Sequence, residues 1–395
     1  MYSIDIKSDC GCWSSPIKLG RYYWAVGAGL FTSQQLHIPT TSGTQTVNMV
    51  YDCGTNSSQV FIEREIDEYL LTIGNADIDL LFISHLDKDH ISGISYLYKQ
   101  LSNMGKEIKK IYYPFLELSE LVYLASSPRN QSIRSILFSI DDYLNEYANE
   151  VIAVPPEDMD RSRSTSLPGL SFGGNSAHFS VWNFSFSVLP SYDKRDGFYD
   201  DLSASLSMSK IDLLSKINDS HFRDKLFTNN LNLLKQCYRN QRGLRDLNNT
   251  SLCVYSGPPE NKSKNYKTFN SKHMSVNQAS KSRLAKWNPR PGWIGTGDAP
   301  LASNRNVNDF NKLFDKFKIH CDSITVPHHG SIKNWNNSIM TNFPIGSYCF
   351  AGANGQYKHP SPFVVSQINN LGHFFMNMTE FINTRFSESY SIYYR

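Results

Sequence analysis

The sequence has no long hydrophobic run. Its most apolar stretch, residues 78 to 83, is the length of a strand and is interrupted by Asp79, whereas a helix needs about 20 apolar residues to span a bilayer. The first residues, from Met1 to Lys7, also lack the basic start and apolar stretch of a secretory signal. The sequence therefore predicts a soluble, cytoplasmic protein with no membrane partner.

An excess of charge of one sign is also missing. Lysine and arginine number 39 against 36 aspartates and glutamates, which gives a formal net charge of +3. Hydrophobic residues make up 40% of the 395 positions and charged residues 19%, a composition typical of globular proteins. Global disorder is thereby excluded, and the average charge alone argues against a histone-like polyanion binder.

Cysteine is sparse, and its seven copies form an odd number. Cys53, Cys253, Cys321 and Cys349 lie in apolar, strand-like surroundings where buried thiols are common. Cys10 and Cys12 have no second Cys/His pair nearby to complete a metal site. A reducing compartment fits this usage best.

Strands and helices alternate along the chain. Residues 47–51 are β-rich, residues 61–73 have apolar positions at helical spacing, and residues 78–83 form a short buried run. Residues 108–114 predict another strand, and residues 116–150 and 201–246 predict helices. The order strand, helix, buried strand predicts a layered α/β fold.

The last third of the chain returns to strand and helix alternation, and the sequence has no internal repeat. We therefore expect a single domain over residues 1–395. The excess length is assigned to insertions at about 116–180, 201–246 and 257–290. Residues 157–177 and 257–290 are expected to be loops.

Four potential metal ligands follow the buried run directly: His85, Asp87, Asp89 and His90. In a loop that leaves the carboxyl end of a parallel strand, such side chains can converge on one point. Mixed imidazole and carboxylate ligands suit Zn²⁺, Mn²⁺ or Fe. The alternative is a solvated helix start capped by one of the aspartates, which does not explain two flanking histidines.

Three further strand ends have the same character. Asp298 follows Gly297, the adjacent pair His328 and His329 follows a second strand, and His359 follows a third. A lone histidine at a strand end is usually structural. Five of the 11 histidines in such turns favour a shared metal site.

These motifs resemble those of the metallo-β-lactamase superfamily, whose first motif is H-x-H-x-D-H. With aspartate at the second position, the pattern is similar to the metallo-hydrolase domain of bacterial competence (ComEC-type) DNA-uptake proteins. That subfamily also has an Asn-x-x-Ser-Leu strand, a Gly-Asp turn, a Pro-His-His-Gly-Ser turn and a terminal His-Pro. Here these stand, in the same order, at Asn248–Leu252, Gly297-Asp298, Pro327–Ser331 and His359-Pro360.

The resemblance implies a four-layer αββα sandwich with one or two divalent metal ions, most often zinc or manganese, at the edge between its sheets. By position, the implied metal ligands are His85, Asp87, Asp89, His90, Asp298 and His328. Asp87 and Asp89 can accept a proton, and His329 and His359 are candidates for a spare ligand, for donating a proton or for contacting phosphate. The histidine of the family's third motif is expected near residues 189–191, where this chain has Leu-Pro-Ser, so the number of metal ions stays open.

The expected activity is metal-dependent hydrolysis, because a bound ion acidifies water and polarises the scissile group. No G-x-S-x-G elbow or P-loop is present, which sets serine hydrolases and NTPases aside. Asn248, Ser251 and Ser331 are assigned to substrate or to orienting neighbouring groups.

The basic segment 257–290 favours a nucleic-acid substrate. It has eight lysines and arginines against one acid, Glu260, with aromatic residues between them, which is typical of single-strand binding. It contributes more than the whole net positive charge of the chain. Because it joins two strands that carry site residues, we expect at least one of its ends beside the metal. The residues assigned to substrate here are Lys262, Lys264, Lys267, Arg283 and Lys286.

We therefore predict a nuclease or phosphodiesterase acting on DNA or RNA, for which defence against foreign DNA is one conceivable role. One alternative is a small-molecule esterase or phosphodiesterase of the phosphocholine-ester or cyclic-nucleotide type, with the insertions roofing its pocket. Another is an effector that is inactive until a partner or protease acts, for example at the Ser/Arg-rich residues 161–166.

Overall fold

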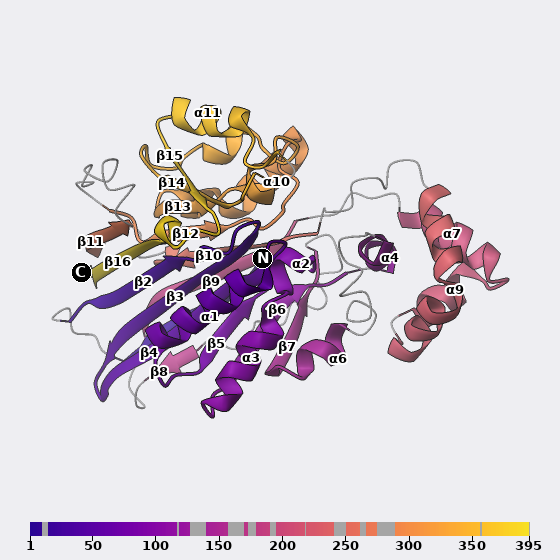
Figure 1. The fold of residues 1–395 in the computed structure, drawn as a ribbon, viewed down its shortest axis with the longest axis horizontal. Coiled ribbons are helices and arrows are strands. Elements are labelled where there is room, and N and C mark those ends of the chain that lie inside the picture. Colours follow the sequence, from indigo (N-terminus) through magenta and orange to yellow (C-terminus); the bar gives the residue numbers. More distant parts are fainter. Residues whose placement is uncertain are drawn as a thin grey trace.

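The computed structural model carries two eight-stranded sheets (Figure 1). It describes residues 1–9, 15–116, 118–126, 140–156, 170–172, 179–189, 195–217, 219–240, 250–260, 266–274, 289–355 and 358–394. Among these residues, no helix is both long and apolar enough to cross a bilayer.

The first sheet combines the amino-terminal strands with the end of the chain. In spatial order it contains β11 (Tyr266–Met274), β16 (Phe386–Tyr394), β2 (Ile17–Tyr23), β3 (Gly29–Thr40), β4 (Gly43–Thr55), β5 (Ile78–Phe82), β6 (Ile108–Pro114) and β7 (Ala148–Val154). Strands β4 to β7 are parallel, so their carboxyl ends share one edge of the sheet.

The second sheet is built mostly from later strands. Its order is β15 (Phe374–Met378), β14 (Tyr348–Gly352), β13 (Cys321–Thr325), β12 (Gly292–Gly295), β10 (Leu252–Gly257), β9 (Phe179–Val188), β1 (Tyr2–Ser8) and β8 (Leu170–Phe172). Strands β12 to β15 are parallel and bring a second set of carboxyl ends together.

The two sheets pack face to face through aromatic and branched side chains. Phe82 and Tyr112 of the first sheet meet Phe186 of the second, with ring centroids 5.0 to 5.2 Å from Phe186. This inner core has Trp182, Phe184 and Val254 fully buried. This cluster joins residues of both sheets and fixes their edges relative to each other.

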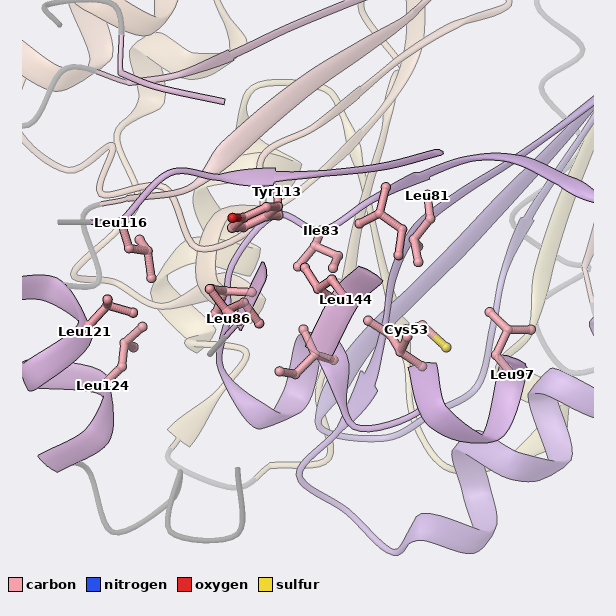
Figure 2. Packing of buried hydrophobic residues seen from close by; sticks show 14 of the residues in the cluster. Cys53, Leu81, Ile83, Leu86, Leu97, Tyr113, Leu116, Leu121, Leu124 and Leu144 are labelled. Carbon is pink, nitrogen blue, oxygen red and sulfur yellow. The ribbon is translucent and has the colours of Figure 1, made fainter. Parts of the chain in front are cut away.

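Helices cover the outer faces. On the first sheet, α1 (Gln59–Ile73) and α3 (Ile94–Asn103) pack their apolar sides onto β4 to β6. Figure 2 shows part of this cluster, including Cys53 and Leu97. On the second sheet lie α10 (Asn304–Lys318) and α11 (Pro362–Asn370). The layers are helix, sheet, sheet, helix, so the predicted αββα sandwich is confirmed.

Helix α10 shows how the sequence produces this packing. Val307, Phe310, Phe314 and Phe317 recur every three or four residues and are all buried, which forms one apolar stripe. Ser303 caps the helix by accepting a hydrogen bond from the Asn306 amide at 3.1 Å. The stripe faces Cys253, Tyr255 and Ile294 of the sheet in a single cluster.

A group of helices lies at one end of the molecule. It contains α7 (Arg195–Ser205), α8 (Lys210–Lys216) and α9 (Ser220–Asn240), and it stands beside α4 (Leu118–Ser126) (Figure 1). Leu226 and Phe227 of α9 share a buried cluster with Leu121 of α4. Up to residue 240 these helices agree with the helical prediction for residues 201–246, and residues 241–246 lie outside the described residues.

Three local predictions were wrong. Residues 148–150, expected to be helical after α6 (Ile140–Asn145), begin strand β7, which pairs in parallel with β6. Residues 170–172, expected to belong to a loop, form β8, which pairs in parallel with β1. The 257–290 segment, expected to be a loop, contains β11, which pairs with β16 along its whole length. In each case pairing with a distant strand decides the structure, and local polarity does not reveal such a partner. Residues 161–166 lie outside the described residues.

Candidate metal centre

The candidate site lies where the carboxyl ends of the parallel strands of both sheets meet. Strand β5 leads into Ser84, His85 and the short helix α2 (Lys88–Ile91), while Asp298 follows β12. The turn η5 (Pro327–Gly330) follows β13 and carries two histidines. The motifs that the sequence analysis singled out therefore converge, as expected from strand-end geometry.

Asp52, near the end of β4, holds the centre of the site. Its backbone is left-handed, with φ of 57°, and its carboxylate is fully buried. It accepts hydrogen bonds of 2.6 Å from both the amide and the hydroxyl of Ser84, and it lies 2.9 Å from Nδ1 of His90. This contact fixes the His90 ring so that Nε2 faces the site, as carboxylates do behind metal-binding histidines.

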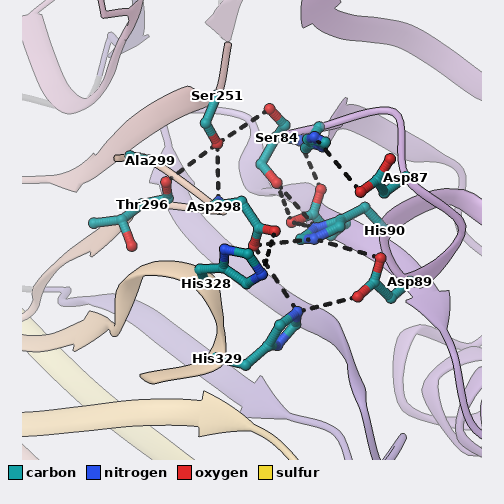
Figure 3. Close-up of polar contacts among 12 residues, drawn as sticks. Ser84, Asp87, Asp89, His90, Ser251, Thr296, Asp298, Ala299, His328 and His329 are labelled. Carbon is teal, nitrogen blue, oxygen red and sulfur yellow. Dashed lines mark hydrogen bonds and ion pairs between the residues drawn. The ribbon is translucent and has the colours of Figure 1, made fainter. Parts of the chain in front are cut away.

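Three side chains form a group that could hold a metal ion. The ligand atoms of Asp89, His90 and His329 all lie within 4.8 Å of one another. Nε2 of His329 is 3.2 Å from Oδ2 of Asp89. Figure 3 shows these side chains pointing toward one another around Asp298. Oδ1 of Asp298 lies 3.3 Å from Nε2 of His90 and 3.9 Å from Nε2 of His329.

The donor atoms fit a divalent cation. His90 Nε2, His329 Nε2 and Asp298 Oδ1 are buried and make no well-formed hydrogen bond, an arrangement that costs free energy unless something else satisfies them. Ligands that share a zinc ion at 2.0 to 2.2 Å lie roughly 3 to 4 Å apart, which is the separation seen here. Imidazole nitrogens mixed with carboxylates suit zinc and manganese alike.

The electrostatics also favour a cation. Burial alone would raise the pKa of Asp298, but His328, His90 and His329 outweigh it and hold that pKa well below its usual range. Burial would also raise the pKa of Asp89, but His329 and His90 outweigh burial and bring that pKa down to about 2. For His90, burial lowers the pKa, and Asp52 and Asp298 raise it further than burial lowers it. The carboxylates therefore stay ionised and create a negative site.

His85 and Asp87 form a second pair at the same edge. His85 is buried, and its Nε2 lies 3.8 Å from Oδ2 of Asp87. Leu189, where a third-motif ligand was expected, is buried and apolar, and residues 190–194 lie outside the described residues. The described residues thus give one group of three ligands and one separate pair.

Ser251 ties the second sheet to the first at the site. Its fully buried hydroxyl accepts a 3.0 Å hydrogen bond from the Asp298 amide and lies 3.3 Å from the Ser84 carbonyl. The Leu252 amide donates to the same carbonyl at 2.8 Å. Gly297 has φ of 51°, and a side-chain carbon there would come within 2.5 Å of the Ser84 hydroxyl. Ser251 therefore positions Asp298.

The two remaining histidines lie toward solvent. His328 has a side chain 21% exposed, with Nε2 3.7 Å from Oδ2 of Asp298. The rings of His328 and His359 are 5.4 Å apart. Both residues of the His328-His329 pair have positive φ, 46° and 53°, and this backbone directs His329 into the ligand group and His328 to its rim. From the sequence, we expected His328 to be the ligand, with His329 as a candidate for a spare ligand, proton transfer or phosphate contact.

The site loops also carry lysines that sequence reasoning overlooked. Lys88 separates Asp87 from Asp89, Lys333 follows Ser331 by two residues, and Lys358 precedes His359. Lys333 and Lys358 are exposed, whereas Ser331 is buried and its hydroxyl accepts the Lys333 amide at 3.3 Å. Their place in the ligand-bearing loops is the signal that could have identified them.

The basic segment is placed differently from our expectation. Strands β10 and β12 are antiparallel, with Ser256 opposite Trp293, so Gly257 and Gly292 both lie at the edge away from the site. The expectation that one end of residues 257–290 lies beside the metal is wrong. Lys267 lies on β11, at the margin of the first sheet. Asn248, Lys262, Lys264, Arg283 and Lys286 lie outside the described residues.

Comparisons with known proteins find a match over part of the chain. Residues 43–170, which include β4, β5 and the His85–His90 motif, match the metallo-beta-lactamase superfamily. Together with the two-sheet sandwich, this match implies a metal-dependent hydrolase.

Among solved structures, the chain is similar to the metallo-beta-lactamase fold protein YhfI from Bacillus subtilis, with 12% identity and a TM-score of 0.23. The alignment covers 44% of this chain and 53% of YhfI. The comparison with curated proteins gives no match.

Proposed function

We propose that the protein is a metal-dependent phosphodiesterase whose substrate is a nucleic acid. The observation that carries the proposal is the pairing of a carboxylate-rich ligand group with lysines in the loops that bear the ligands. A negative ligand group attracts the metal, and exposed lysines in the loops that carry its ligands favour an anionic substrate over a neutral ester or lactam. The motif resemblance to the competence-type metallo-hydrolase domain supports the same choice.

Asp89, His90, His329 and Asp298 would hold one ion, and His85 with Asp87 would contribute to a second. Such an ion acidifies a water molecule and polarises a phosphoryl oxygen. Asp52 keeps His90 oriented, and Ser251 keeps Asp298 in place. Lys333 and Lys358 bind the phosphate from the solvent side. His359, next to His328 at the rim, donates a proton to the leaving oxygen.

The test is an activity assay of metal-loaded protein. Protein freed of metal and reloaded with Zn²⁺ or Mn²⁺ should hydrolyse bis(p-nitrophenyl) phosphate and labelled DNA or RNA oligonucleotides. Asp298→Ala and His85→Ala should lower turnover at least about 100-fold. Asp79→Asn is the matched control. Asp79 is buried on β5, the strand that leads to His85, but it contacts Asn48 and Lys109 instead of the site.

Two results would sink the proposal. One is metal-loaded protein that hydrolyses an uncharged ester but no phosphodiester. The other is full activity of Asp298→Ala. Hydrolysis of bis(p-nitrophenyl) phosphate without cleavage of any oligonucleotide would instead favour the small-molecule phosphodiesterase. Lys333→Gln with Lys358→Gln should raise KM for the phosphodiester more than it lowers kcat, because these lysines bind charge present in the ground state.

A further inference from the structure

Part of the outer face of the first sheet has no described helix over it. Helices α1 and α3 lie over β4 to β6, whereas β2, β16 and β11 lie toward the other margin of the same sheet (Figure 1). The inward residues of these uncovered strands, such as Leu19 and Ile392, are buried in the core between the sheets. Their outward residues therefore form a solvent-facing surface that no part of the proposed site uses.

One row of neighbouring side chains crosses this surface. Strand pairing places Phe269 opposite Ser391, Ser391 opposite Lys18, and Lys18 opposite His37. The row spans four strands, or about 14 Å at the usual strand spacing. On the same face, Lys267 lies opposite Tyr393 in the neighbouring row.

The residues in these two rows are aromatic, basic or small. Phe269 is 65% exposed, and Lys18 and Lys267 are exposed as well. The rings of Phe269 and Tyr393 are 5.9 Å apart and nearly perpendicular. Along β16 the other outward positions are serines, Ser387, Ser389 and Ser391.

No outward position of β11, β16, β2 or β3 is acidic within the described ranges; Glu388 of β16 points inward and pairs with Arg21. Burial and then the nearby Lys18 both lower the pKa of His37. The described outward positions therefore contribute the charges of Lys18 and Lys267 without a neighbouring acid, a balance that suits a polyanion.

We infer that this face, made by Lys18, His37, Lys267, Phe269 and Tyr393, is a docking surface for single-stranded nucleic acid. The lysines would contact phosphates, and the exposed Phe269 ring would stack on a base, the combination used by strand-binding sheets. A single strand is the occupant that uses both features, because a duplex keeps its bases stacked inside. The inference rests on the proposed nucleic-acid substrate and specifies where that substrate is held.

The surface is separate from the ligand group but lies on the same sheet. The row meets β4 at Thr46, and Asp52 is six residues further along that strand, about 20 Å at the rise of an extended chain. Docking and hydrolysis can therefore be measured separately. A dinucleotide-sized substrate at the metal would not reach this surface.

Binding is tested with metal-free protein in EDTA, so that no hydrolysis occurs. Fluorescence anisotropy with labelled 20-nucleotide oligo(dT) and oligo(U) distinguishes DNA from RNA. Lys18→Gln with Lys267→Gln should reduce the slope of log affinity against log salt by about 1.4, because each lost phosphate contact contributes about 0.7 for a single strand. Phe269→Ala should weaken binding at least fivefold.

The matched control is Lys99→Gln with Lys216→Gln, which removes the same charge from exposed positions on α3 and α8. It should leave the salt slope unchanged. Equal effects of the two double variants would overturn the inference, since binding would then reflect net charge alone. Wild-type protein that binds neither oligonucleotide would also overturn the inference. So would a Phe269→Ala variant that binds the strand like the wild type and changes only by loss of a dimer in size-exclusion chromatography.

The two proposals fail in different ways. The Phe269→Ala variant should hydrolyse bis(p-nitrophenyl) phosphate at the wild-type rate, because that substrate does not reach the sheet face. Absence of this hydrolysis in the wild-type protein would contradict the proposed function. Retained turnover with no strand binding would contradict only the docking surface.

Discussion

At the scale of single residues, Asp52 explains why the site holds its shape. From the sequence, we assigned Asp52 no role. Its contact with His90 joins residues 38 positions apart, and a lone acid after a strand predicts no partner. The His85–His90 motif, in contrast, could be predicted from the sequence because all its ligands lie within six consecutive residues.

We expect Asp52→Asn to lower the affinity for Zn²⁺ or Mn²⁺ by about 10- to 100-fold, because the amide no longer supports the His90 ring through a charged contact. Competition with a chromogenic chelator measures this. Asp79→Asn, a buried aspartate on β5 away from the ligands, should change stability but not affinity. Equal metal affinity of Asp52→Asn and wild-type protein would show that His90 does not need its carboxylate.

His320 predicts a pH dependence of folding. It is 1% exposed, and burial, followed by Arg290, lowers its pKa to about 4. The unfolded chain binds this proton near pH 6.5, so His320 contributes stability above pH 6.5 that is lost as the pH falls to 4. Wild-type protein should lose up to about 3 kcal/mol relative to His320→Gln over this range. Urea unfolding at several pH values measures it, and parallel curves would refute the assignment.

At the scale of elements, local patterns predicted β5 and β6 closely. The residues of β5 form a compact apolar run, and those of β6 are rich in isoleucine and tyrosine. They did not predict β11, whose residues are polar and whose partner β16 is more than 100 residues away. They also could not show that β10 and β12 run antiparallel, and this direction moved the basic segment to the far edge. Strand pairing over long distances is thus what sequence patterns lack.

The turn after β12 makes an element-scale prediction. Gly297→Ala introduces a side chain at positive φ that also collides with Ser251 and Ser84, so it should lower both stability and metal affinity. Gly105→Ala is the control: φ is 65° there, and nothing lies within 4 Å of the added carbon. It should cost about 1 to 2 kcal/mol in urea unfolding without affecting metal binding. Matching metal affinities of the two variants would remove Gly297 from the site.

At the scale of the whole molecule, the site exists only because two sheets are held in register. Arg21 of β2 is fully buried and links them: it donates to Glu388 at 2.9 Å, to the Ser323 hydroxyl at 3.1 Å and to the Pro291 carbonyl at 2.7 Å. Ser323 belongs to the second sheet, on the strand that leads to the His328-His329 turn. A change at Arg21 therefore acts on the histidine ligands through the register of the sheets.

Removing Arg21 or Glu388 alone leaves the other charge buried without its partner. Arg21→Met should lower the free energy of unfolding by about 3 to 5 kcal/mol, because Glu388 stays ionisable among buried tyrosines. Arg21→Met with Glu388→Leu removes both charges and should recover most of that loss in urea denaturation. A double variant no more stable than the single one would mean that the hydrogen bonds to Ser323 and Pro291, rather than the charge pair, hold the sheets. In that case both variants should bind the metal more weakly than the wild type, because both lack the hydrogen bonds of Arg21 that hold the strand before the His328-His329 turn.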